Sequence, residues 1–191
     1  MDKIASKLLE LVEETSDINQ HLFALKGYAD GCEHITEMGV RGVVSTWAFL
    51  ASRPKVLVAI DIENCPVEEI SEAAKEASID FRFIKDDTIR EGFEIEETDF
   101  LFIDTWHVYP QLKKELSMHA SKVKKYIAFH DTQTFGFLND KTFYSQPQGP
   151  QPQGLQPAIK EFLQDNPEWV ISSNYKHNNG LIIIKRVNEN L

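Results

Sequence analysis

Two short segments of this sequence end an apolar run with an acid and an imidazole. FLFIDTWHVYP carries Asp104 and His107, and YIAFHDT carries His130 and Asp131. An imidazole titrates near neutral pH and can move a proton, whereas carboxylate oxygens suit hard cations. The two segments therefore predict an acid–base site or a metal site, provided that the fold brings them together.

Earlier apolar runs end in the same way. HITEMGV carries Glu37 and Gly39, KVLVAIDI ends near Asp61, and DFRFIKDD ends in Asp86 and Asp87. Any one of these acids could simply cap a turn, because short acidic side chains favour turns. Five successive strands with such an ending favour a shared site, since ligands of open parallel sheets bind outside the carboxyl ends of the strands.

The elements that must position these residues alternate along the chain. Helical spacing of apolar residues separates most of the apolar runs, and together they indicate a mostly parallel α/β sheet covered on both faces. The last two runs are joined only by HNNG, so we expect an antiparallel hairpin with Asn179-Gly180 at its turn. The predicted strands are 34–40, 55–62, 80–87, 99–105, 126–132, 168–176 and 180–186, and the predicted helices include 2–15, 66–77, 109–123 and 154–167.

The chain is expected to form one domain over residues 1–191, with residues 1–30 as an N-terminal helical cap. One segment departs from the alternation: residues 133–154 are rich in proline, glutamine and glycine and repeat QPQG around Pro150. Such a segment cannot form a helix or an inner strand. A lid over a substrate and a floppy surface insertion both stay open for this loop.

Composition limits the classes of partner. The chain has 191 residues, 42% hydrophobic and 26% charged, with 20 basic and 30 acidic residues for a net charge of −10. That balance opposes a sequence-independent grip on nucleic acid and favours a small-molecule partner. No apolar stretch approaches the roughly 18 residues of a membrane span, so we expect a cytoplasmic protein without a membrane partner. Cys32 and Cys65 are expected to be small buried hydrophobes, and His21, His119 and His177 to lie at or near the surface.

Several of these motifs occur together in a known family. The segments EMGVRG, AIDI, LFIDTWHVYPQLKKEL and YIAFHDT, closed by an NNG hairpin, resemble the class I S-adenosylmethionine-dependent methyltransferases over about residues 30–186. The similarity is greatest to the branch with cephalosporin-hydroxylase-like and macrocin-type O-methyltransferases, whose fourth and fifth strands end in motifs like I-D-x-x-H-x-Y and H-D-T. The resemblance implies a Rossmann-like, doubly wound, seven-stranded sheet, mostly parallel with an antiparallel C-terminal strand.

The resemblance also implies roles for the strand-end residues. Asp61, which lies 24 residues after Glu37, would bind the ribose of the cofactor. The remaining cofactor residues would be Glu37, Gly39, Arg41 and Gly42 at the methionine portion, Asp86 or Asp87 at the adenine, and Asp104 beside the crevice. In metal-dependent members the corresponding acids hold Mg²⁺, which here points to Asp104 and Asp131 as ligands, with His130 as a further candidate ligand.

Methyl transfer to a hydroxyl group requires alignment of two reactants and removal of a proton. His107 is the first candidate base and His130 the second, with Asp104 beside them. The predicted function is therefore S-adenosylmethionine-dependent methylation of an oxygen on a small molecule or sugar. Two alternatives stay open: a non-catalytic relative that binds a nucleoside, and another enzyme on this scaffold, such as an iron-dependent hydroxylase using His107, Asp104 and His130.

Overall fold

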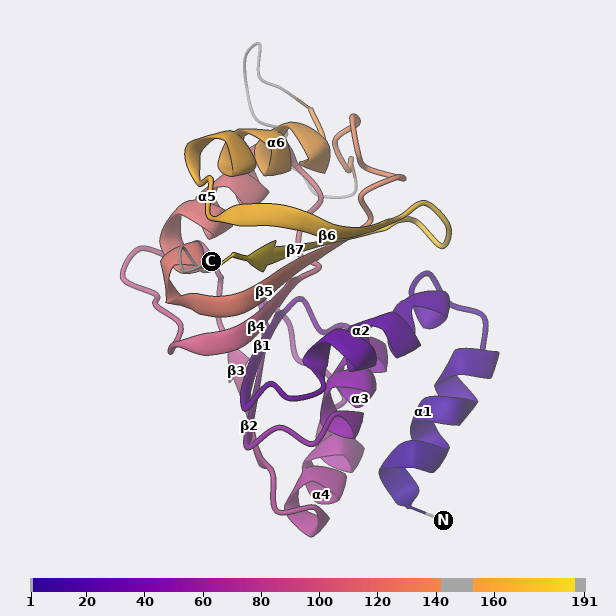
Figure 1. Cartoon of the computed structure of the whole chain (residues 1–191). Helices are drawn as coiled ribbons and strands as arrows, with labels where there is room; N and C mark the ends of the chain where they lie inside the picture. The colour runs from indigo at the N-terminus through magenta and orange to yellow at the C-terminus, as the bar shows by residue number, and fades with distance from the viewer. Residues whose placement is uncertain (1, 142–152, 188–191) are drawn as a thin grey trace.

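The strands of the protein lie in one mixed sheet with the order β3-β2-β1-β4-β5-β7-β6 (Figure 1). The computed structural model describes residues 2–141 and 153–187. Within these ranges β7 runs opposite to the other strands and pairs antiparallel with both β5 and β6. The predicted fold class is confirmed. The strands are β1 (His34–Met38), β2 (Val56–Asp61), β3 (Asp80–Lys85), β4 (Thr98–Ile103), β5 (Val123–His130), β6 (Trp169–Tyr175) and β7 (Leu181–Arg186).

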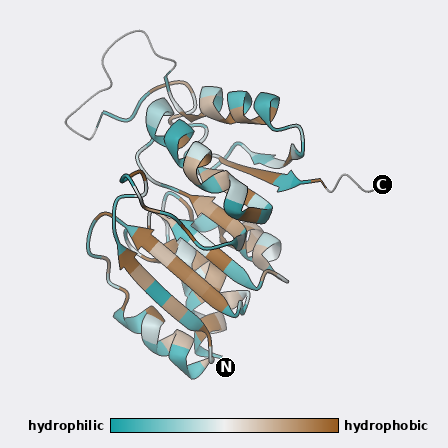
Figure 2. Ribbon diagram, turned by 90° about the vertical axis from the view of Figure 1, so that its left-hand side faces the viewer, coloured by the Kyte–Doolittle hydropathy of each residue, from teal (hydrophilic) through white to brown (hydrophobic). Residues whose placement is uncertain are grey.

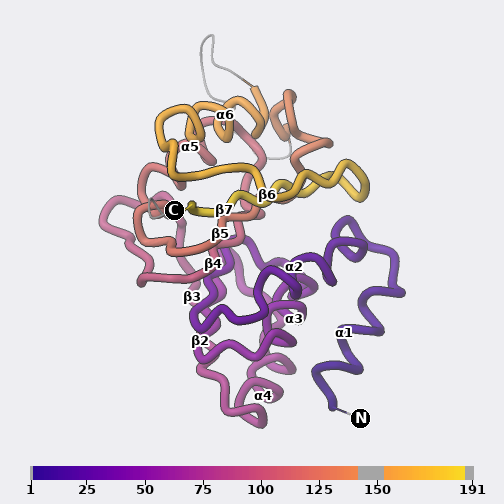
Figure 3. The backbone as a smooth tube through the Cα atoms, viewed as in Figure 1, coloured from indigo at the N-terminus to yellow at the C-terminus, as the bar shows by residue number. Residues whose placement is uncertain are grey.

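Helices cover both faces of the sheet, whose central strands are largely apolar (Figure 2). Their buried side chains belong to two cores, one on each face. Helices α2, α3 and α4 lie on one face with α1 packed outside α3, and α5 and α6 pack together on the other face (Figures 1 and 3). Alternate residues of β1 serve the two resulting cores: Ile35 joins one and Met38 the other. The helices are α1 (Lys3–Glu13), α2 (Leu22–Ala29), α3 (Val44–Ala51), α4 (Glu68–Glu76), α5 (Tyr109–His119) and α6 (Leu155–Asp165).

The strand order reverses between β1 and β4. β1 pairs with β2 on one side and with β4 on the other, and all four strands β1, β2, β4 and β5 run in the same direction. Their carboxyl ends therefore share one edge of the sheet, with the switch point between β1 and β4. A switch point opens a crevice, because the loops on its two sides diverge toward opposite faces.

The N-terminal segment packs against this edge through the hairpin turn that joins β6 to β7. The side chain of Asn178 accepts a hydrogen bond from the backbone N–H of Gln20 (3.0 Å) and donates one to the carbonyl of Ser16 (2.9 Å). Arg41, in the turn after β1, forms an ion pair with Asp17. Residues 16–20 are thus tied to both sides of the crevice edge.

The prediction of surface histidines was correct for only one of three. His177 is exposed, but His21 and His119 are fully buried. Each buried ring is accommodated by backbone carbonyls: His21 Nε2 lies 3.0 Å from the Asn178 carbonyl and His119 Nε2 lies 2.8 Å from the Thr88 carbonyl. Burial lowers the pKa of both imidazoles, that of His21 to about 4.

The predictions for the lid and for the two cysteines have different outcomes. Residues 142–152 of the predicted lid lie outside the described residues, so the lid stays a prediction. Cys32 is buried as expected, whereas Cys65 is half-buried. No helix within residues 2–141 and 153–187 is long and apolar enough to cross a membrane.

Candidate functional site

The turn after β1 passes directly over the end of β4. Gly39 has φ +85°, and a Cβ atom built on it would lie 2.0 Å from the backbone oxygen of Asp104. Only glycine fits this contact, because it has no Cβ and readily adopts positive φ. The close approach places the predicted methionine-side turn beside the predicted catalytic strand end.

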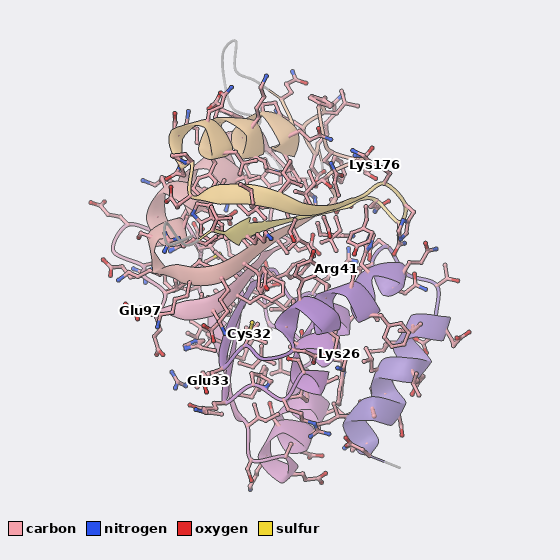
Figure 4. The ribbon with its side chains drawn as sticks, in the orientation of Figure 1. Lys26, Cys32, Glu33, Arg41, Glu97 and Lys176 are labelled. Carbon is pink, nitrogen blue, oxygen red and sulfur yellow. The ribbon has the colours of Figure 1, made fainter. Side chains whose placement is uncertain are left out.

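Glu37 is fully buried at the end of β1. Ser45, in the first turn of α3, donates a hydrogen bond from its hydroxyl to Glu37 Oε1. Burial raises the pKa of Glu37 to about 8, against the opposing effect of this hydrogen bond. Ser45 was not predicted as a site residue. Arg41 and Gly42 were predicted as site residues and lie in the exposed part of the turn. Figure 4 shows Arg41 below the hairpin turn that carries Lys176, and its guanidinium pairs with Asp17.

Asp61 at the end of β2 holds the turn after β1 in place. Its Oδ2 accepts hydrogen bonds from the backbone N–H groups of Val40 (2.7 Å) and Arg41 (3.0 Å), and its Oδ1 accepts one from Glu63 (2.9 Å). Burial alone would raise the pKa of this half-buried carboxyl, but the three N–H donors lower it, so Asp61 is ionised.

Asp86 and Asp87 follow β3, one strand farther from the switch point. The backbone N–H of Asp86 donates to the carbonyl of Asp61 (3.0 Å), which joins the two strand ends. The Asp86 carboxylate pairs with Arg90, and Asp87 Oδ1 accepts from the N–H of Ile89 (3.0 Å). Both acids therefore shape the loop over residues 86–90, which borders the same edge of the sheet as Asp61.

Four of the predicted residues meet at the ends of β4 and β5. His107 Nε2 lies 3.2 Å from Asp104 Oδ1 and 3.0 Å from Asp131 Oδ2, and His130 Nδ1 lies 3.3 Å from the same Asp104 oxygen. We call Asp104, His107, His130 and Asp131 the strand-end cluster. Asp131 has φ +57°, a conformation that aspartate tolerates better than most residues and that ends β5.

The groups that face His130 favour its protonated form. Its Nε2 lies 3.3 Å from the carbonyl oxygen of Asn178, which can only accept, and its Nδ1 faces the Asp104 carboxylate. A ring that faces an acceptor at each nitrogen is best satisfied as the imidazolium. Burial opposes that charge, but the Asp104 carboxylate prevails and raises the pKa of His130 to about 9. In turn, His130 and His107 hold the pKa of Asp104 below its usual range despite burial.

His107 is held from both sides by groups that were not predicted. Its Nδ1 lies 3.4 Å from Asp140 Oδ2, and the ring of Phe135 stacks on it in parallel at 4.8 Å between centroids. Burial lowers the pKa of His107, but the carboxylates around it, Asp104 first, raise it above the ordinary value. The only sequence signal for Asp140 and Phe135 was their place in the long loop after β5.

The cluster includes a donor set that fits a divalent cation. Asp104, His107 and Asp131 each offer one ligand atom, and these atoms lie within 4.8 Å of one another. Asp140 on the far nitrogen of His107 would fix its tautomer, as outer carboxylates do for metal-bound histidines. His130, predicted as a ligand, is not one of these three, and its Nδ1 lies 3.8 Å from Asp131. Two carboxylates with an imidazole suit Mn²⁺ or Fe²⁺ better than Mg²⁺.

Comparison of the sequence with family models and with curated proteins found no match. Solved structures do share its fold. The O-methyltransferase from Bacillus cereus, solved in complex with SAH, superposes with a TM-score of 0.58 and 16% identity, covering 97% of this chain and 91% of that one. The O-methyltransferase TomG from Streptomyces achromogenes, involved in tomaymycin synthesis and solved with SAM, gives 0.61 and 14%, covering 98% and 91%.

The neighbours also include methyltransferases that act on other substrates. The 16S rRNA methylase RmtB has a TM-score of 0.58 and 13% identity, covering 96% of this chain and 70% of that one. The chain therefore has the Rossmann-like fold that these S-adenosylmethionine-dependent methyltransferases share, and several of these neighbours are O-methyltransferases. The narrower branch, the exclusion of nucleic acid and the cytoplasmic location stay predictions.

Proposed function

We propose that this protein is an S-adenosylmethionine-dependent methyltransferase that acts on an oxygen of a small molecule or sugar. The observation that carries the proposal is the division of the carboxyl edge: Glu37 and Asp61 lie on one side of the switch point and the strand-end cluster on the other. A cofactor in the crevice would have its nucleoside on the first side and its reacting sulfonium facing the second. The fold shared with solved methyltransferases supports this assignment.

Asp61 keeps capacity for a ribose hydroxyl. A carboxylate can accept about four hydrogen bonds, and three are used by backbone N–H groups. The Cys65 thiol, a weak donor, also hydrogen-bonds this carboxylate, and a ribose hydroxyl would compete with it for the remaining acceptor site. Glu37 and the backbone of residues 39–42 would bind the methionine portion, and the loop that carries Asp86 and Asp87 would border the adenine.

The proposed base is His107. Because carboxylates face both of its nitrogens, the ring favours the protonated form and must first lose the Nε2 proton, keeping the one on Nδ1 toward Asp140. As a hydroxyl oxygen then attacks the methyl carbon and the carbon–sulfur bond breaks, Nε2 would receive the hydroxyl proton. Asp104 and Asp131, 3.2 and 3.0 Å from Nε2, would stabilise the imidazolium that forms. A divalent cation bound at the two carboxylates would orient the acceptor oxygen and lower its pKa.

Calorimetric titration with S-adenosylhomocysteine tests the cofactor pocket, with and without Mg²⁺ or Mn²⁺. We expect saturable binding at one site, weakened about 10- to 100-fold by Asp61→Ala, because a hydrogen bond to a charged group is lost. Asp80→Ala is the matched control: Asp80 begins β3 at the opposite edge of the sheet and pairs with Arg82. Wild-type protein that binds no S-adenosylhomocysteine under any of these conditions would overturn the proposal.

A further inference from the structure

Three side chains on one face of α5 hold a single residue of the loop after β3. Gln111, Glu115 and His119 are spaced four apart, so they lie on one side of the helix. Thr88 Oγ1 donates to Glu115 Oε1 (2.6 Å) and lies 3.3 Å from Gln111 Nε2, while the Thr88 carbonyl lies 2.8 Å from His119 Nε2. We call Gln111, Glu115 and His119 the α5 ladder.

Glu115 also binds the other side of the crevice. Its second oxygen, Oε2, accepts a hydrogen bond from the hydroxyl of Thr105 (2.9 Å), which directly follows Asp104 of the strand-end cluster. Glu115 is fully buried, so its carboxylate has no solvent to bind instead. One carboxylate therefore joins the loop after β3 to the end of β4.

The fold alone does not require this group. Apolar residues of α5, such as Leu112 and Leu116, already pack the helix onto the sheet, and burying a carboxylate costs free energy. The Glu115 carboxylate accepts hydrogen bonds from Thr88, Gln111 and Thr105. Two of these donors, Thr88 and Thr105, belong to different loops, so the carboxylate holds both loops in place. What those loops share is the edge at which the cofactor is proposed to bind.

We propose that Glu115 is a positioning residue that holds the nucleoside-side loop, residues 86–90, at a fixed distance from the strand-end cluster. The inference rests on the proposed function, because it assigns the loop to the adenosine part of the cofactor. Glu115 acts only through Thr88 and Thr105, so removal of either bond should loosen one side of the crevice. The chemistry that recognises the ligand remains that of the two loops.

The test measures binding of S-adenosylhomocysteine and of 5′-methylthioadenosine, which lacks the amino-acid portion, to three variants. Thr88→Val should weaken both ligands about tenfold and by the same factor, because one hydrogen bond to a charged group is lost and the effect falls on the adenosine part. Glu115→Ala removes the acceptor of all three bonds and should weaken both ligands at least as much. Glu115→Gln should stay within about threefold of wild type, since its amide can still accept from Thr88 and donate to the Thr105 hydroxyl. If Glu115→Ala does not fold, Thr88→Val decides.

The matched control is Glu161→Gln. Glu161 accepts hydrogen bonds from Tyr109 and Lys113, so it also joins α5 to a neighbour, but it contacts neither loop. Native-state amide exchange adds a readout without ligand: amides of residues 87–93 should exchange faster in Thr88→Val, with α6 unchanged.

The outcomes separate the two proposals. If wild type binds S-adenosylhomocysteine and Thr88→Val and Glu115→Ala bind it equally well, the positioning role is wrong and the proposed function stands. If wild type binds neither nucleoside, the proposed function fails and the positioning role falls with it. Faster exchange in the loop combined with equal loss of both ligands supports the inference.

Discussion

Replacement of Gly39 by alanine tests whether the turn after β1 and the end of β4 are in the contact described. Two costs add. Positive φ on a non-glycine residue costs about 1–3 kcal/mol. The new methyl group, 2.0 Å from the Asp104 oxygen, would force the two backbones apart, which costs about 1–3 kcal/mol more as overpacking does. We therefore expect Gly39→Ala to lower the free energy of unfolding by about 2–6 kcal/mol.

The control is Gly31→Ala. Gly31 has a similar φ of +78°, but a Cβ built there meets nothing within 4 Å. Its substitution should cost only the strain of the positive φ, about 1–3 kcal/mol. Urea-induced unfolding followed by circular dichroism gives both values, and similar slopes would show that the unfolded states are comparable. Equal losses in the two variants would refute the close contact between Gly39 and Asp104.

Two further predictions concern the buried residues around the site. Glu37 has a folded-state pKa of about 8, above its ordinary value of 4.5, so the folded protein favours the protonated form. The free energy of unfolding should therefore fall as the pH rises from 4.5 through 8, at up to about 1.4 kcal/mol per pH unit. Glu37→Gln should flatten this slope in urea titrations at several pH values, and an unchanged slope would contradict the raised pKa of Glu37. Phe49 is fully buried against Phe100 and Phe102, so Phe49→Ala should lower the free energy of unfolding by about 3–5 kcal/mol in the same assay. Leu9 is half-exposed, so Leu9→Ala should lower it far less. Similar losses in the two variants would argue against this core.

The strands could be predicted because they are apolar runs, but their ends could not. β1 was predicted to extend to residue 40 and stops at Met38, and β5 was predicted to extend to residue 132 and stops at His130. In both cases the next residue, Gly39 or Asp131, has positive φ and turns the chain out of the sheet. Helix α2 was not specified within the predicted cap, because LFALKGYA is apolar on most sides and shows no clear stripe.

The strand-end cluster was predictable for a related reason. Carboxyl ends of neighbouring parallel strands share one edge of the sheet. Residues 104 and 131 therefore lie close together if the two strands that they end are neighbours in the sheet. Asp140, Asn178 and Glu115 could not be found this way, because their partners are set by packing between distant segments. The same limit explains the error at His21 and His119. Each ring is buried because it hydrogen-bonds a backbone carbonyl of a distant segment, and the local sequence does not indicate such a contact.

The turn after β1 contains non-glycine residues with positive φ. Arg41 and Val43 both have positive φ, 43° and 58°, in a turn that contains only Gly39 and Gly42. Such conformations are strained for non-glycine residues, most of all for a β-branched one, and persist only where surrounding bonds impose them. Asp61 supplies those bonds by accepting from the N–H groups of residues 40 and 41. The same carboxylate therefore has to stabilise the turn and receive the ribose, so loss of Asp61 should affect the shape of the cofactor site as well as a single contact within it.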